Sequence, residues 1–412
     1  MKERTAHIIR RKRAHQRFKV CGFAALAIGL SMLLLLLGSL IMNGANAFRQ
    51  TMVTVSVTLD PAKIDPRKIM ESDWRKILGD AFLASLPEVV STAQQREVRK
   101  ILSNAAGFML RDKVAEDLDL IGQTISFKFP VSDPFDQLMI RKLQDNSGNI
   151  SPAQQKVFAS LHEQGRLSRP INWRLLQNAD SRFPEIAGLR GALWGTFYVI
   201  LICFFISFPI GVGAGIYLEE FNRKGRLADF IEINVNNLAA VPSVVFGLLG
   251  LGVFINAFGM PRSAPIVGGL TLALIVLPTI IISTRAALKA VPPSIRDAAY
   301  ALGASKHQVI LHHVLPLAFP GLMTGTIIGL AHALGETAPL LLVGMNAFIT
   351  AAPEGILSAS TTLPTQIFLW SDSPERGFIA RTSAAILVLL AFLILMNGIA
   401  VLLRRKFEKK LS

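Results

Sequence analysis

The stretch DAAYALGASKHQVILHHVLP, from Asp297 to Pro316, lies between two long apolar segments and has the pattern of a short helix, a turn and a second helix. Pro292 and Pro293 stand just before it, where proline favours the start of a helix. Gly303 marks the turn, and Pro316 predicts a break after the second helix. Such an element between two membrane segments is a rigid surface feature that another protein can hold.

Six apolar segments of the chain are long enough to cross a bilayer, which takes about 20 residues of helix. They cover residues 20–42, 191–217, 236–257, 264–284, 317–345 and 383–403. Of the 412 residues, 51% are hydrophobic and 17% are charged, a balance that is typical of a membrane protein with one sizeable part in water. We therefore expect an all-α membrane protein with six transmembrane helices.

The distribution of Lys and Arg predicts the orientation of these helices. The tails and loops 1–19, 218–228, 285–316 and 404–412 hold 20 basic residues, whereas the loops 258–263 and 346–382 hold 3. Cytoplasmic loops carry the excess of basic residues in membrane proteins. We expect both termini in the cytoplasm, with 1–19 as a basic tail before the first transmembrane helix 20–42, and 285–316 as a cytoplasmic loop. Although the net charge is +15, these tails flank membrane segments, so we predict a lipid membrane as the partner and no nucleic acid.

Residues 43–187 lie between the first two spans and mix 19 basic with 17 acidic residues, which is the composition of a domain in water. Apolar and polar residues alternate at 53–59 and 124–131, as in strands with one buried face. Helical patterns cover about 71–83, 92–118 and 152–164. We predict an α+β domain on the periplasmic side, inserted between helices 1 and 2, and the sequence does not reveal its role. The remaining residues, 188–412, would form a transmembrane domain of five helices.

Several chemistries lack their sequence signatures in this chain. No G-x-x-x-x-G-K-[ST] motif is present, and no Gly-Lys pair occurs at all, so the chain has no P-loop for ATP. Neither Cys/His spacing typical of zinc sites nor a serine nucleophile elbow is found. We therefore predict no catalytic residue, metal site or cofactor in this chain.

The loop quoted first resembles the E-A-A-x-x-x-G-x9-I-x-L-P loop of importer-type ABC permeases. The positions that match are Ala298, Ala299, Gly303, Leu315 and Pro316. The chain departs from the pattern at Asp297, where Glu is usual, and at His313, where an apolar residue is usual. The resemblance implies that this loop is the coupling helix, which sits in a cleft of a separate ATPase subunit. Two copies of that subunit would bind ATP and Mg²⁺, so the ATPase activity would belong to the partner.

A second stretch, GLAHALGETAPLLLVG from Gly329 to Gly344, resembles the G-E-T-A-P-L signature of the PstA-type permease of the phosphate importer, and VPSVVFGLLGL at 241–251 is also similar to that family. The resemblance implies a multi-pass protein of the bacterial inner membrane. It would pair with a second, similar permease and receive phosphate from a periplasmic binding protein. One alternative is the same architecture importing another oxyanion. A periplasm-sensing membrane protein is a more distant alternative, because a large outer domain between two spans is also a sensor layout.

The fifth span carries polar residues that we assign to the substrate pathway. Gly321, Gly325 and Gly329 are spaced four apart, so they share one helix face and allow close helix packing. His332 and Glu336 are expected to continue that face. Ionisable side chains in a membrane span usually face a polar interior, although Glu336 can also simply bond a neighbouring helix.

The resemblance adds Thr337, from the signature, to the pathway. It also shows a departure, because the family commonly has Arg at the position of His332. Arg carries a permanent charge and a bidentate fork for phosphate, whereas His is charged only under mildly acidic conditions. The paired permease is therefore a second candidate for supplying the basic group.

Overall fold

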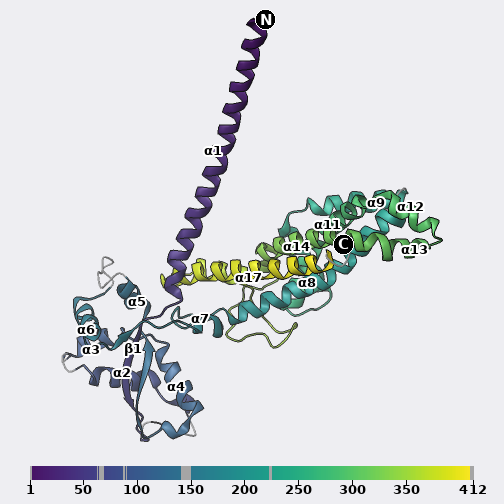
Figure 1. The fold of residues 1–412 in the computed structure, drawn as a ribbon. Helices are drawn as coiled ribbons and strands as arrows, with labels where there is room; N and C mark the ends of the chain where they lie inside the picture. The colour runs from purple at the N-terminus through teal and green to yellow at the C-terminus, as the bar shows by residue number, and fades with distance from the viewer. Residues whose placement is uncertain are drawn as a thin grey trace.

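The computed structural model describes residues 2–408 apart from 63, 65–68, 87, 88, 90, 141–149 and 222–224. It has three parts, which are a long N-terminal helix, an α+β domain that we call the outer domain, and a helical bundle (Figure 1). The outer domain lies at one end of the bundle, and α12 and α13 lie at the opposite end, which we call the loop end. This arrangement confirms the prediction of a mostly helical membrane protein with an inserted α+β domain.

Among the residues that the structure describes, five helices are long and apolar enough to cross a membrane. Their bounds are α1 Lys2–Ala47, α8 Arg190–Ile216, α11 Pro265–Ala290, α14 Leu315–Gly335 and α17 Gly377–Glu408. Two of them continue into π-helical turns, η3 Tyr217–Phe221 after α8 and η5 Val309–Val314 before α14. The number of spans rises to six if one bent pair of helices is included.

That bent pair stands where we predicted a straight third span at 236–257. Helix α9 covers Arg226–Ala239, whereas α10 covers Ser243–Leu249 and continues as the π-helix η4, Gly250–Ala257. The two halves meet at an angle of 105°. The break contains Pro242, which has no backbone N–H and disfavours helical geometry in the residue before it. The expectation of one straight helix was therefore wrong.

Helix α11 is the central helix of the bundle, and glycines bring its neighbours close to it. On α8, a Cβ at Gly211 would meet Ile280, and one at Gly215 would meet Thr284. On the other side, Gly321 of α14 lies against Ala287 of α11. Gly325 and Gly329 of α14 lie against Ser283 and Val276 of the same helix. Small residues allow helix backbones to approach where lipid removes the hydrophobic advantage of large side chains.

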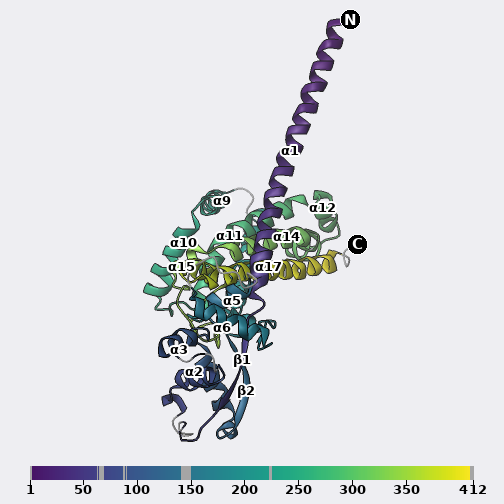
Figure 2. The same cartoon turned by 90° about the vertical axis from the view of Figure 1, so that its left-hand side faces the viewer.

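Helix α1 is longer than the predicted span 20–42, because it continues without a break through the basic tail. It meets α17 near Gly44, where a Cβ would come 2.8 Å from Leu387 Cδ1. Beyond this crossing it projects away from the bundle and the outer domain in both perpendicular views (Figures 1 and 2). Its apolar side chains, such as Phe23 and Leu35, are exposed. This surface therefore requires lipid or another subunit to cover it.

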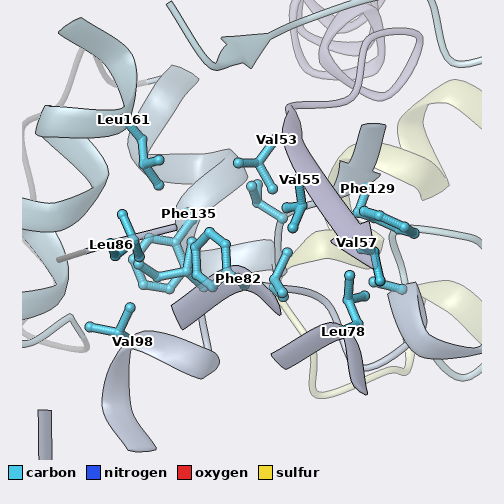
Figure 3. Close-up of a cluster of buried hydrophobic side chains, with 14 of the residues drawn as sticks. Val53, Val55, Val57, Leu78, Phe82, Leu86, Val98, Phe129, Phe135 and Leu161 are labelled. Carbon is cyan, nitrogen blue, oxygen red and sulfur yellow. The ribbon is translucent and has the colours of Figure 1, made fainter. Parts of the chain in front are cut away.

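The outer domain is built on a three-stranded antiparallel sheet. Strand β1, Met52–Thr58, pairs along its length with β2, Thr124–Pro130, and briefly with β3, Leu167–Ser168. The alternating valines of β1 are buried, as the alternation in the sequence predicts. Figure 3 shows Val55 and Val57 of β1 pointing toward Phe82 and Leu78 of a packed helix.

Short helices complete the outer domain. They are α2 Trp74–Ala84, α3 Thr92–Arg99, α4 Ala106–Glu116, α5 Asp133–Ile140, α6 Pro152–Glu163 and α7 Arg174–Gln177, with 3₁₀ turns at Ile69–Glu71 and Leu118–Leu120. The single helix predicted at 92–118 is therefore two helices. They separate where Leu102 forms a β-bridge with Val131, which takes the backbone out of helical geometry.

The outer domain is joined to the start of α17 through buried polar groups. The backbone N–H of Asp133 donates to Glu185 Oε1 over 2.9 Å, and Arg381 of α17 donates to Gln50 Oε1 over the same distance. A Cβ on Gly377, the first residue of α17, would touch the Asp133 carboxylate at 2.6 Å. Burial raises the pKa of Asp133 and that of Glu185 above the usual carboxyl range. We call the region formed by Gln50, Asp133, Glu185, Gly377 and Arg381 the junction.

Candidate functional site

The loop end of the bundle carries the helix–turn–helix that the sequence predicts. Helix α12, Pro293–Ala301, begins with a proline at its first position. Gly303 follows with φ of +84°, a left-handed conformation that favours glycine. Ser305 and Gln308 then form a capping box that starts α13, Lys306–Gln308. The sequence therefore specifies both the end of the first helix and the start of the second.

The residues matched to the coupling-loop pattern divide between a buried side and an exposed side. Ala299 is buried in a cluster with Val309 and Val314 of η5. Asp297, Ala298 and Gly303 are exposed. Leu302, at the tip, exposes 88% of its surface, and Tyr300 is exposed beside it. An apolar tip that the chain itself does not cover is a feature of protein contact sites.

The predicted break at Pro316 is absent, so that expectation was wrong. The chain runs from α13 through η5 into α14 as one apolar helical segment, Lys306–Gly335. Leu315 and Pro316 are half-buried in the first turn of α14. Pro316 follows directly on the wider π-helical turn, where regular α-helical bonding is already interrupted. The helix can therefore continue through a residue that lacks a backbone N–H.

Sequence reasoning missed the polar contacts that fasten α12 to the bundle. Arg296 Nη2 donates to Glu220 Oε1 of η3 over 2.7 Å and to the Leu288 carbonyl of α11 over 2.9 Å. Its Nη1 donates to the Val291 carbonyl, which follows α11, over 2.8 Å. One signal was available in the sequence. Glu219 and Glu220 follow closely on the apolar segment 191–217, and charged residues at such a position require partners.

A second group of charged side chains lies near the contacts of Arg296. Arg285 of α11 pairs with Glu232 of α9 at 2.9 Å and lies 3.6 Å from Glu219 of η3. Lys289 approaches Glu219 at 3.7 Å. These contacts connect α9 to the loop end, although Glu232 and Lys289 are more exposed than Arg296 and Glu220.

The polar residues of the fifth span lie together at the end of α14. His332 Nε2 is 3.1 Å from Glu336 Oε1, with 62% of the His332 side chain exposed and 19% of that of Glu336. Helix α14 ends at Gly335, so Glu336 is its C-cap residue. Thr337 precedes the short helix α15, Ala338–Leu342. The two side chains therefore form a polar pair at the end of α14.

The apolar stretch 317–345 is not one continuous helix. It is interrupted after Gly335, because Pro339 in the following turn cannot donate to the helical ladder. His332 lies within α14, about two turns beyond Gly325 on the same helical face. Its side chain is mostly exposed, whereas Gly329 packs on Val276 of α11.

The two stretches that carry the second resemblance are in contact. A Cβ on Gly247 of α10 would lie 2.7 Å from the Cα of Pro339 at the start of α15. Gly250 likewise faces Val343, at 3.0 Å. The bend in the third span thus brings α10 against the polar end of α14.

Another helical element, α16 Leu363–Ser371, follows in the long outer loop. Among the residues described, no group of three or more His, Cys, Asp or Glu side chains is arranged to hold a metal ion.

Comparison with known families gives two separate matches along the chain. Residues 207–409 match the model of the family described as "binding-protein-dependent transport system inner membrane component". Residues 5–148 match a domain of unknown function, DUF3333. The first match covers most of the bundle and the loop end. The second covers α1 and much of the outer domain.

Individual relatives agree with the family match. A "phosphate transport system permease protein PstA" of Yersinia pestis is 34% identical over 54% of this chain and 73% of its own length. A "probable ABC transporter permease protein YqgI" of Bacillus subtilis is 29% identical over 53% of this chain and 79% of its own length. A solved inward-facing MetNI methionine ABC transporter is 21% identical, with a TM-score of 0.41 over 53% of this chain and 95% of that one. The sequence motifs, the apolar helices and the relative of Yersinia pestis together show that the chain belongs to the PstA-type family of ABC importer permeases.

Proposed function

We propose that this chain is a permease subunit of an ATP-driven phosphate importer in the bacterial inner membrane. The observation that carries the proposal is the similarity to permeases named for phosphate transport, at 32–34% identity over 70–73% of their lengths. The stretch Gly329–Gly344, which resembles the PstA signature, supports the same cargo. A second, similar permease would complete the pathway, and a periplasmic binding protein would deliver phosphate.

In this function the α12–α13 segment is the coupling element. Its exposed apolar tip at Leu302 would insert into a cleft of the ATPase subunit, which binds ATP and Mg²⁺. Two ATPase copies would close on ATP, and the closed form would favour one orientation of the spans over the other. The permease would thereby convert hydrolysis by its partner into alternating access, with no catalytic step of its own.

The pair His332–Glu336 would act at the pathway. An anion path needs positive potential, and an unpaired carboxylate would repel phosphate. At 3.1 Å from His332 Nε2, Glu336 fixes the position of the imidazole. Thr337, which follows directly, supplies a hydroxyl that can hydrogen-bond an oxyanion. The second permease would contribute the remaining donors.

The cargo is tested by uptake of radiolabelled phosphate into vesicles that hold the reconstituted complex, with sulfate, molybdate and arsenate as competitors. We expect ATP-dependent uptake that arsenate inhibits, because arsenate has the geometry and charge of phosphate. Sulfate and molybdate should compete weakly. Uptake of sulfate or molybdate in place of phosphate would reject phosphate and leave the oxyanion alternative.

Orientation is tested separately. With both termini cytoplasmic, a reporter that works only in the periplasm should be active when inserted at the exposed turn at Gly165 and silent when fused after the C-terminus. The opposite pattern would place the loop end outside and would reject coupling to a cytoplasmic ATPase.

A further inference from the structure

Helix α12 has only nine residues, and much of its surface is exposed. A displacement of such a short helix moves the membrane spans only if a firm connection joins them. Ala299 provides a small apolar contact with η5, which leads into α14. The same apolar cluster includes Leu288 of α11 and, partly buried, Ile216 of α8. The polar part of the connection to α8 and α11 depends on Arg296.

Arg296 joins three elements at once. It belongs to α12, its guanidinium donates to Glu220 of η3, and it also donates to the carbonyls of Leu288 and Val291 at the end of α11. Because η3 continues α8, the pair links the coupling helix to the second span. The planar fork of Arg suits such simultaneous bonds, whereas Lys offers a single ammonium group.

Burial makes this connection stiff. The side chains of Arg296 and Glu220 expose only 11% and 7% of their surfaces. The two side chains could separate without a cost in free energy only if water reached both charges. A buried charge that loses its partner is strongly unfavourable. The neighbouring contact of Lys289 with Glu219 is longer, at 3.7 Å, and Lys289 is 59% exposed. Lys289 can leave Glu219 at little cost, because its own ammonium is exposed to solvent and Arg285 stays 3.6 Å from the same carboxylate.

We infer that Glu220–Arg296 is the joint that transmits movement of α12 to α8 and α11, with Arg296 as a positioning residue for transport. The inference rests on the proposed coupling role of α12. With the joint intact, closure of the ATPase subunits must move the spans. With the joint broken, α12 follows the ATPase while the spans remain in place. Hydrolysis then proceeds without transport.

The test uses the full complex with both permeases and the ATPase subunits, reconstituted in vesicles. The variants are Arg296→Met, Glu220→Gln and the double variant Glu220→Met/Arg296→Met, which removes both charges of this pair. Lys289→Met is the matched control on the same end of the bundle. The measurements are complex assembly, ATP hydrolysis without cargo, and phosphate transported per ATP.

For Arg296→Met and Glu220→Gln we expect hydrolysis without cargo to rise about threefold and transport per ATP to fall about tenfold, as for the loss of a typical coupling free energy. The double variant should assemble at the wild-type level and show the same uncoupling. Lys289→Met should remain at the wild-type ratio. A double variant that assembles and transports with the wild-type ratio would overturn the inference, even if the single variants failed to assemble.

The inference and the proposed cargo fail in different ways. A wild-type complex that does not transport phosphate rejects the cargo, but the rise in cargo-free hydrolysis still tests the joint. If the wild type transports phosphate and cargo-free hydrolysis is unchanged in every assembled variant, the joint is rejected while the cargo stands.

Discussion

In the outer domain the largest fully buried side chains are phenylalanines, Phe82 and Phe158, whereas in the bundle the closest helix approaches occur at glycines such as Gly325. The outer domain is exposed to water, so removing large apolar side chains from water stabilises it. The bundle lies in lipid, which is as apolar as leucine, so close backbone packing is the main gain. One chain therefore follows two packing rules, and opposite substitutions should damage its two parts.

The largest effect is expected when a large side chain is removed from the outer domain. Phe82→Ala should destabilise that domain by about 3–5 kcal/mol, because a fully buried aromatic ring leaves a cavity. Hydrogen exchange of the full chain should show faster opening of β1 and α2, with the bundle unchanged. Met70→Ala, at an exposed site, is the control. Equal opening in both parts would show that the two do not fold separately.

In the bundle the damaging change is an addition of bulk. Gly325→Leu should cost about 1–3 kcal/mol or more, because any Cβ there collides with Ser283 on α11. The amount of folded protein in the membrane should fall. Gly29→Leu on α1, where nothing lies within 4 Å, is the matched control and should have no effect. If both variants accumulate like the wild type, α14 and α11 do not pack as closely as described.

At the loop end, glycine is needed for the backbone conformation of a turn and not for close helix packing. Gly303 has open space around it but a left-handed backbone, so Gly303→Val should strain the turn by about 1–3 kcal/mol. Gly303→Asn, which tolerates this conformation, should be milder. Gly303→Asp should remain in the membrane yet lose transport and bind the ATPase less well. Measuring transport at matched membrane levels would separate these cases. Wild-type transport in all three variants would exclude this loop as the coupling element.

The polar end of α14 should affect transport without affecting packing. His332→Arg is expected to retain or improve phosphate uptake, because it restores a permanent charge. Glu336→Gln should reduce uptake more than assembly, since only the charge is lost. His332→Ala should reduce uptake, because it removes the imidazole from the position where the family commonly has a basic residue. Uptake measured from about pH 5.5 to 8 brackets the range in which histidine titrates. If all three variants take up phosphate like the wild type over this pH range, His332 and Glu336 only contribute to packing.

The smallest expected effect is at the junction between the two regions. Burial raises the pKa of Asp133 and of Glu185, so the folded protein binds these protons more tightly than the unfolded chain. The stabilisation is therefore complete below the ordinary carboxyl pKa and is lost as pH rises through the raised values. Protection of the Asp133 amide, which donates to Glu185, should decrease over that window. In the double variant Asp133→Asn/Glu185→Gln, the protection of this amide should depend less on pH. Protection that increases with pH in the wild type would contradict this sign.

Local patterns predicted the elements that depend on local chemistry. The alternation at 53–59 and 124–131 identified β1 and β2, and five of the six apolar runs are long helices. The turn at Gly303 was predicted because only glycine readily adopts that backbone conformation. These features follow from neighbouring residues, so a single sequence reveals them.

The sequence did not reveal features that depend on distant partners. Helix 92–118 was predicted whole because the bridge from Leu102 to Val131 joins residues far apart in the chain. The bend after α9 has a local cause in Pro242, and it was missed because the span was predicted from hydrophobicity alone. Arg296 was overlooked because its partners lie in α11 and η3. His332 and Glu336 were placed together correctly, but the end of α14 before Glu336 was not located.

The uninterrupted course of α1 has a mechanical consequence. From its crossing with α17 at Gly44 to Lys2, the helix is about 63 Å long, at about 1.5 Å per residue. That is about twice the hydrocarbon thickness of a bilayer. A stiff rod held near one end acts as a lever arm. A tilt of about 5° at Gly44 would displace the basic end by about 5 Å over this helical length. Small angular shifts where α1 meets α17, close to the outer domain, would therefore become large translations at the far end of the helix.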